Sequence, residues 1–309
     1  MKLFIIGNGF DLAHKLPTEY WCFRKYLCKY HYDFLRDFEQ HYSIYPGNTE
    51  EEKRKILWNC FETNLANIDE EIIVEDAVGI DMNLDGGNVG IVDILYDYFK
   101  NEYKYIESLA DYLKSWVRGI KIKKAFPITS KINNKDRNYF ITFNYTSTLE
   151  KIYGINYSDI LHIHGSLYNN DPDPIIGHGN TQRIKAMSQK KNVAENNALE
   201  KEISIYEVIG DYYKHTFKDV SKYMHKLWVL NEKQIDEIDV IGHSISGVDL
   251  PYFRYIDSLT KYSARWNVFF YKPEEETSMK QALLAQGIDA DRIKLYPTKC
   301  FYDLQTECL

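Results

Sequence analysis

Short aliphatic runs separated by helical segments are the feature that most constrains how this chain folds. The runs are KLFIIG near the start and then NYFITF, DILHIH, EIDVIGHS, WNVFFYK and RIKLYP. Continuous apolar runs are typical of strands buried on both faces of a parallel sheet, whose connections are helices. The sequence therefore predicts an α/β, Rossmann-like fold with a mostly parallel sheet of about six strands and helices on both faces.

Residues 31–125 differ from the rest because they contain almost no strand pattern. Apolar residues recur there at helical spacing in two long stretches, separated by the loop sequence GIDMNLDGGNVG. We therefore expect a large helical insertion at 31–125, after the first strand. Residues 1–30 and 126–309 would form the Rossmann-like domain, and 309 residues suffice for both parts.

Charge and composition narrow the class of partner. The net charge is −7, so no broad basic surface for nucleic acid is expected. No apolar run approaches the roughly 20 residues needed to cross a bilayer, and MKLFII has no cleavage pattern of a signal peptide. The five cysteines are scattered, which favours a reducing compartment over a disulfide framework. We expect a cytoplasmic protein without a membrane partner.

Small and polar residues follow four of the predicted strands. In a parallel sheet the carboxyl ends of the strands meet at one rim, where ligands bind. We therefore expect these residues to line a single ligand site. The four groups are Gly7, Asn8, Gly9 and Asp11; Asn144; His164, Gly165 and Ser166; and Gly242, His243, Ser244 and Asp249.

The first two groups suit a nucleotide, although each also has a simpler interpretation. The GNG loop permits close backbone approach, but Leu12 stands where G-x-G-x-x-G has its third glycine. Asp11 either contacts ribose hydroxyls or caps the following turn. Asn144 offers donors and an acceptor for a water and a sugar hydroxyl, and the alternative is a turn-forming role.

The run LHIHGS supplies the candidate base. Period-two alternation places His162 and His164 on one face of the strand. His164 is the outer of the two, and Gly165 leaves room beside it. A neutral imidazole accepts a proton from a hydroxyl near neutral pH. We predict His164 as a catalytic base and the deeper His162 as a hydrogen-bonded core residue.

Two other kinds of site compete with this interpretation. His162, His164 and His178 are zinc ligands by residue type, but no matching carboxylate or cysteine spacing accompanies them, so we predict no metal. Ser244, its neighbouring histidine and Asp249 suggest a hydrolase triad. The segment GHSIS does not match G-x-S-x-G, however, and adjacent strand residues point in opposite directions.

Four blocks of the chain resemble the signature regions of the bacterial AbiH proteins, which are associated with abortive infection by bacteriophage. The blocks are IIGNGFDLAHKLPTEY, FITFNYTSTLEKIY, LHIHGS and VIGHSISGVDLPYF, in the family's order. The resemblance implies an antiviral defence protein. It also implies a phage-derived trigger and a homo-oligomer as partners to look for.

AbiH proteins are in turn distantly similar to sirtuin-like NAD-binding domains. That similarity implies NAD as substrate or ligand, with the GNG glycines facing the dinucleotide and Gly242 and Ser244 holding its adenosine side. Asn144 would order the attacking water or the nicotinamide ribose, and His164 would act on a ribose hydroxyl. The implied activity is that of a hydrolase, an NAD glycohydrolase (NADase).

The chain departs from the sirtuin pattern in ways that keep other functions open. Asn8 stands where sirtuins have alanine, Thr146 stands where they have an aspartate, and the C-x-x-C zinc module is missing. The missing aspartate favours a non-catalytic nucleotide-sensing module as the alternative, unless Asp11 compensates. The basic segments KIKKAF and SQKKN are the support for an RNA-directed nuclease.

Overall fold

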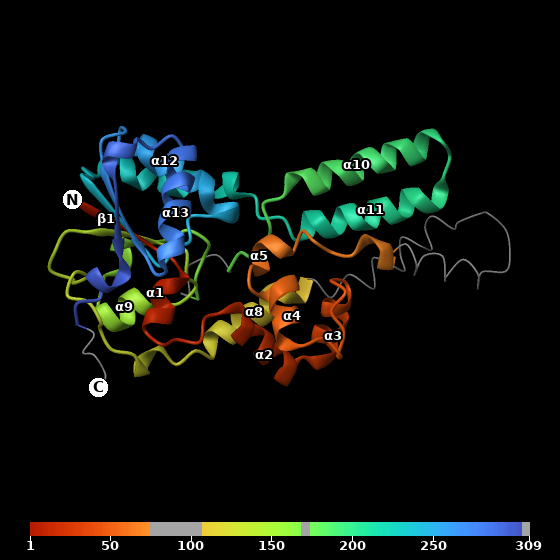
Figure 1. Ribbon diagram of the computed structural model, residues 1–309, viewed down its shortest axis with the longest axis horizontal. Helices are drawn as coiled ribbons and strands as arrows, with labels where there is room; N and C mark the ends of the chain where they lie inside the picture. The colour runs from red at the N-terminus through yellow and green to blue at the C-terminus, as the bar shows by residue number, and fades with distance from the viewer. Residues whose placement is uncertain (74–106, 168–173, 305–309) are drawn as a thin grey trace. The chain divides into compact units, whose positions relative to one another are not determined.

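The computed structural model describes residues 1–73, 107–167 and 174–304, and these form two compact units (Figure 1). The sheet unit consists of Met1–Glu19, Lys114–Ile175 and Asp219–Leu309. The helical unit consists of Tyr20–Leu113 and Ile176–Lys218, so it comes from two separate segments of the chain. Its second segment lies outside the insertion predicted at 31–125. The predicted loop GIDMNLDGGNVG falls outside the described residues.

Six parallel strands form the single sheet of the sheet unit, which confirms the predicted α/β fold class. Their spatial order is β3-β2-β1-β4-β5-β6, and every neighbouring pair is parallel. The order reverses between β1 and β4, which is the switch point where open α/β sheets bind ligands. The strands are β1 (Lys2–Ile6), β2 (Tyr139–Thr142), β3 (Ile160–His162), β4 (Glu237–Ile241), β5 (Arg265–Phe270) and β6 (Ile293–Pro297).

Helices cover both faces of this sheet because alternate side chains of each strand point to opposite faces. On one face Leu3 and Ile5 pack with α12 (Leu250–Leu259), α13 (Pro273–Ala285) and the 3₁₀ segment η5 (Val220–Glu232). On the other face Phe4 and Ile6 pack with α1 (Asn8–Ala13) and α9 (Thr148–Tyr153). The central strands are therefore buried on both sides, as their continuous apolar runs predict.

An aromatic cluster and a buried ion pair hold the helical unit together. Phe38 and Trp58 pack around Phe61. Arg24 donates two hydrogen bonds to the buried carboxylate of Glu39, which also accepts one from the Trp58 indole. The described helices of this unit are α2 (Tyr20–Tyr30), α3 (Tyr32–Gln40), α4 (Glu50–Lys53), η1 (Arg54–Trp58), α5 (Phe61–Asn64), α10 (Thr181–Asn196) and α11 (Glu200–His215). The boundary between the two units falls within α8 (Ser108–Arg118). Within the described part of the chain, no helix has the length and apolarity that a membrane span requires.

Candidate functional site

The four predicted groups of polar residues follow β1, β2, β3 and β4, which lie next to one another in the sheet. Because these strands are parallel, the groups share one rim of the sheet unit. The switch point between β1 and β4 lies within this rim. The structure thus brings the predicted site residues to a single edge.

Two glycine loops are pressed together at the switch point. A Cβ atom on Gly7 would lie 2.6 Å from the carbonyl oxygen of Gly242, and one on Gly9 would lie 2.8 Å from the Gly242 Cα. The Gly9 amide donates a hydrogen bond to the Gly242 carbonyl at 2.8 Å. These glycines are therefore required by the packing of one loop on the other, and the Gly9 amide binds protein rather than a ligand phosphate. Asn8 is exposed, and its side-chain amide donates to the Thr18 carbonyl at 2.9 Å.

Asp11 is buried beneath this rim in a network of hydroxyl groups. Its carboxylate accepts hydrogen bonds from Thr146 and, at 2.7 Å, from Thr148. Burial raises the pKa of Asp11 to about 6, and the hydrogen bonds from Thr146, Thr148 and Asn144 oppose that rise. The Asn144 side chain also donates to the Gly7 carbonyl at 3.1 Å. A carboxylate therefore contacts the side chain at position 146, but Asp11 of α1 supplies it, not residue 146 itself.

The two histidines of LHIHGS have partners on opposite faces of the sheet. His162 Nε2 lies 2.9 Å from Glu150 Oε1 on α9, whereas His164 Nε2 lies 3.3 Å from the Tyr252 hydroxyl on α12. The expectation of a shared face is therefore wrong. The strand ends at His162, and a turn follows in which Gly165 has φ +83° and donates to the His162 carbonyl. His162 is a buried, hydrogen-bonded residue, as predicted.

The buried His164 and His243 and the half-buried Asp249 form a group that we name the His–Asp–His cluster. His164 Nε2 lies 3.4 Å from Asp249 Oδ1, and His243 Nε2 lies 3.8 Å from Asp249 Oδ2. The Phe143 ring lies against both imidazoles, with ring centroids 5.2 Å from His164 and 4.5 Å from His243. One carboxylate therefore faces two imidazoles that come from the ends of different strands. This grouping can accept, hold and release a proton.

The backbone after β4 fixes the orientation of His243. The Ile245 amide donates to His243 Nδ1 at 2.9 Å, so the neutral ring carries its proton on Nε2, toward Asp249. Ile245 has φ +50° and is buried, which is a strained conformation for a β-branched residue. The exposed Ser244 hydroxyl instead lies 2.8 Å from the Ser246 hydroxyl. Both nitrogens of His243 thus have partners other than Ser244, which disfavours a hydrolase triad.

Not every predicted residue joins the His–Asp–His cluster. Asn144 contacts Gly7 and the Asp11 network, whereas His164 contacts Asp249 and Tyr252, so the two predicted catalytic residues have separate partners. The Ser166 side chain is buried. Tyr252 was missed by sequence reasoning. Its position three residues after Asp249, one helical turn away, is the signal that identifies it.

The third histidine considered as a zinc ligand belongs to the helical unit. His178 Nδ1 accepts from the Asn180 amide at 3.0 Å, and Nε2 donates to the Tyr213 carbonyl at 3.1 Å. Burial lowers the pKa of His178 to about 4, so the ring is neutral. Among the residues that the structure describes, no three histidine, cysteine or carboxylate side chains are grouped as a metal site.

Comparison with known proteins identifies the family. No curated protein matches this sequence. The profile of the family described as bacteriophage abortive infection AbiH matches residues 3–270, which is well over half of the chain and includes the whole carboxyl rim of β1 to β4. This chain therefore belongs to the AbiH family of bacteriophage abortive infection proteins.

Proposed function

We propose that this abortive infection protein hydrolyses the N-glycosidic bond of NAD or of a related nucleotide. Water attacks the anomeric carbon, the bond to the base breaks, and nicotinamide and ADP-ribose leave with one proton released. The observation that carries the proposal is the His–Asp–His cluster at the carboxyl rim of the sheet. Ligands of open α/β sheets bind at this rim, beside the switch point.

His164 is the base in this reaction. His164 Nε2 lies 3.3 Å from the Tyr252 hydroxyl, its hydrogen-bond partner, and 3.4 Å from Asp249 Oδ1. When the ring proton is on Nε2, the basic lone pair is on Nδ1. The carboxylate also stabilises the imidazolium that forms when the ring accepts a proton. Hydrolysis passes through an oxocarbenium-like sugar, and general-base assistance is worth about 10²–10⁴-fold in rate. Because nicotinamide leaves as a neutral molecule from a cation, no strong general acid is required.

Asn144 would present one acceptor to the sugar or the water. Its amide nitrogen is engaged by the Gly7 carbonyl at 3.1 Å and by Asp11, which uses its donor capacity inside the protein. The carbonyl oxygen of the amide then remains as the polar atom for a ligand hydroxyl. This role fits an ordering residue better than an acid or a base.

A non-catalytic nucleotide sensor is the second candidate function, and the burial of His164 and Asn144 favours it. The exposed fraction is 2 % for His164 and 7 % for Asn144. A base must reach the substrate hydroxyl within about 3.2 Å, so these side chains need a conformational opening before they react. A sensor that only recognises the nucleotide would not need this step.

Incubation of the purified full-length protein with NAD, with and without lysate of phage-infected cells, tests the reaction. We expect nicotinamide by chromatography and a loss of at least about 10²-fold in rate for His164→Gln. His162→Gln is the matched control, because His162 is equally buried two residues away but faces Glu150. Equal losses in both variants would reject His164 as the base.

Calorimetry with NAD separates the two candidates. Binding of NAD without release of nicotinamide, under both conditions, would support the sensor and reject the hydrolase. Neither binding nor release would reject both. Thermal melting of each variant shows whether a loss of activity reflects unfolding.

A further inference from the structure

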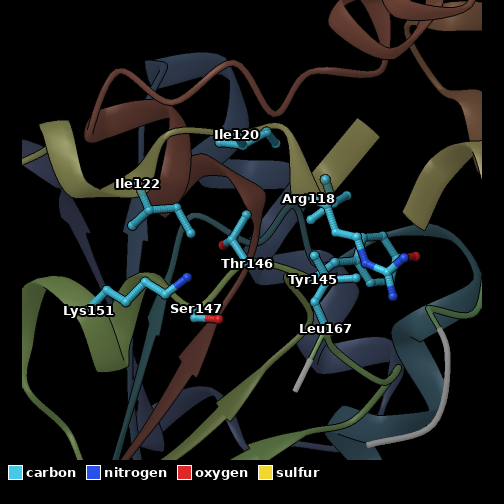
Figure 2. A pocket seen from close by; sticks show the side chains of 9 residues that line it. Arg118, Ile120, Ile122, Tyr145, Thr146, Ser147, Lys151 and Leu167 are labelled. Carbon is cyan, nitrogen blue, oxygen red and sulfur yellow. The ribbon is translucent and has the colours of Figure 1, made fainter. Parts of the chain in front are cut away.

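A cavity of about 370 Å³ lies in the sheet unit at the carboxyl ends of β2 and β3 (Figure 2). Its walls come from the residues that follow β2, from Leu167 after β3, from α9, and from the end of α8 and the segment after it. The volume falls within the roughly 300–1,000 Å³ of small-molecule sites, toward the lower end. Its lining includes the side chains of Arg118, Ile122, Tyr145, Thr146, Ser147 and Lys151.

The charged side chains described at this cavity are both cationic. Arg118 and Lys151 line it, and none of the lining residues that the structure describes is a carboxylate, although the chain as a whole carries a net charge of −7. Neither cation forms an ion pair with another residue in the part of the chain that the structure describes. Cations that no described carboxylate neutralises favour an anionic ligand, and phosphate is an anion that both side chains commonly bind.

The two cations of the cavity are separated in a way that suits a phosphorylated sugar or nucleoside. In Figure 2, Lys151 and Ser147 lie on one side of Thr146, and Arg118 and Tyr145 lie on the other. Apolar side chains of Ile120, Ile122 and Leu167 complete the wall. A ligand with a phosphate at one end and a sugar or base at the other matches this arrangement.

We propose that this cavity binds a nucleoside monophosphate or the corresponding half of a larger nucleotide. The phosphate contacts Lys151 and Ser147, and Arg118 contacts the base at the opposite end of the ligand. The sugar and base lie against the apolar side chains of the lining. The proposal rests on the proposed function for the choice of a nucleotide as the ligand class. It adds a binding site formed by residues outside the His–Asp–His cluster.

The cavity also connects to the rim chemistry through Thr146. This residue lines the cavity and donates its hydroxyl hydrogen to Asp11, which in turn interacts with Asn144. A ligand in the cavity therefore lies against the same hydroxyl network that orients Asn144. This contact places the phosphate end of a nucleotide beside the rim, where its ribose could extend toward the switch point.

Isothermal titration of the full-length protein with AMP, ribose 5-phosphate and adenosine tests the site. We expect AMP and ribose 5-phosphate to bind, and adenosine to bind at least about tenfold more weakly because it lacks the phosphate. Lys151→Gln and Arg118→Gln should each weaken AMP binding about tenfold. Lys121→Gln is the matched control, since it removes one positive charge from the segment that contains Arg118 but does not line the cavity.

The outcomes separate this proposal from the proposed function. An equal loss of AMP affinity in Lys121→Gln and Lys151→Gln would overturn the cavity proposal, because non-specific electrostatic attraction would then explain binding. The cavity proposal would also be overturned if neither AMP nor ribose 5-phosphate binds. It would likewise be overturned if both cavity variants release nicotinamide with unchanged KM, and that result would leave the hydrolysis proposal intact. AMP binding that depends on Lys151 and persists in His164→Gln would support the cavity even if no nicotinamide forms.

Discussion

The Thr146 hydroxyl donates a hydrogen bond to the Asp11 carboxylate, although the two residues are 135 positions apart in the chain. Burial raises the pKa of this carboxyl group from 3.8 to about 6. The folded protein therefore retains a proton between about pH 4 and pH 6 that the unfolded chain releases. The free energy of unfolding contains an Asp11 contribution that is present below pH 4 and is lost as the pH rises through 6.

Asp11→Asn should remove this dependence. Relative to the variant, the wild-type protein should lose about 2 kcal/mol of unfolding free energy between pH 4 and pH 7. Urea unfolding at a series of pH values measures the difference. Asp291→Asn, at an exposed aspartate, is the control and should show no such change. A constant difference between wild type and Asp11→Asn across this range would contradict the prediction.

Replacement of Ile245 should reverse the usual order of alanine and glycine. Its buried side chain makes Ile245→Ala cost about 2–5 kcal/mol, but its φ of +50° is strained for any residue with a Cβ. Ile245→Gly should therefore be about 1 kcal/mol more stable than Ile245→Ala. At Ile238, buried in β4, the same pair should show the usual order, with alanine more stable. Chemical unfolding of all four variants measures the difference in unfolding free energy between alanine and glycine at each position.

Gly242→Ala should destabilise the sheet unit more than a glycine replacement that only changes φ. The added Cβ would lie 2.2 Å from the Phe10 amide nitrogen, at a φ of +66°. We expect a loss of about 3 kcal/mol or more from the combined clash and strain. Gly287→Ala has φ +87° but meets nothing within 4 Å, and should cost about 1 kcal/mol. Similar melting temperatures for the two variants would show that the loops are not in close contact.

The buried carboxylate of the helical unit gives a further prediction. Arg24→Met leaves Glu39 buried without its cation, which should cost about 3–5 kcal/mol. Adding Glu39→Gln should recover part of this loss, because the neutral amide oxygen still accepts from the Trp58 indole. Urea denaturation of the single and double variants measures the recovery. A double variant less stable than Arg24→Met would argue against a charge-based cost.

The topology of the sheet unit was largely predictable from local patterns. Aliphatic runs such as Leu3–Ile6 report burial on both faces, which only a parallel sheet between helices provides. Polar groups after β1 to β4 then had to share one rim, because the carboxyl ends of parallel strands lie together. The assignment of residues 176–218 to the helical unit was not predictable, since helical periodicity does not say which core a helix joins.

The sequence by itself thus determined the strands, their parallel pairing and the residue types at the rim, because period and apolarity are local properties of the chain. Only the tertiary structure decided which groups meet. A turn at Gly165 rotates His164 away from His162 and toward Asp249 and Tyr252, and a strained Ile245 orients His243. Such contacts depend on backbone turns and on which helix covers each face, and these are set by the packing of segments distant in sequence.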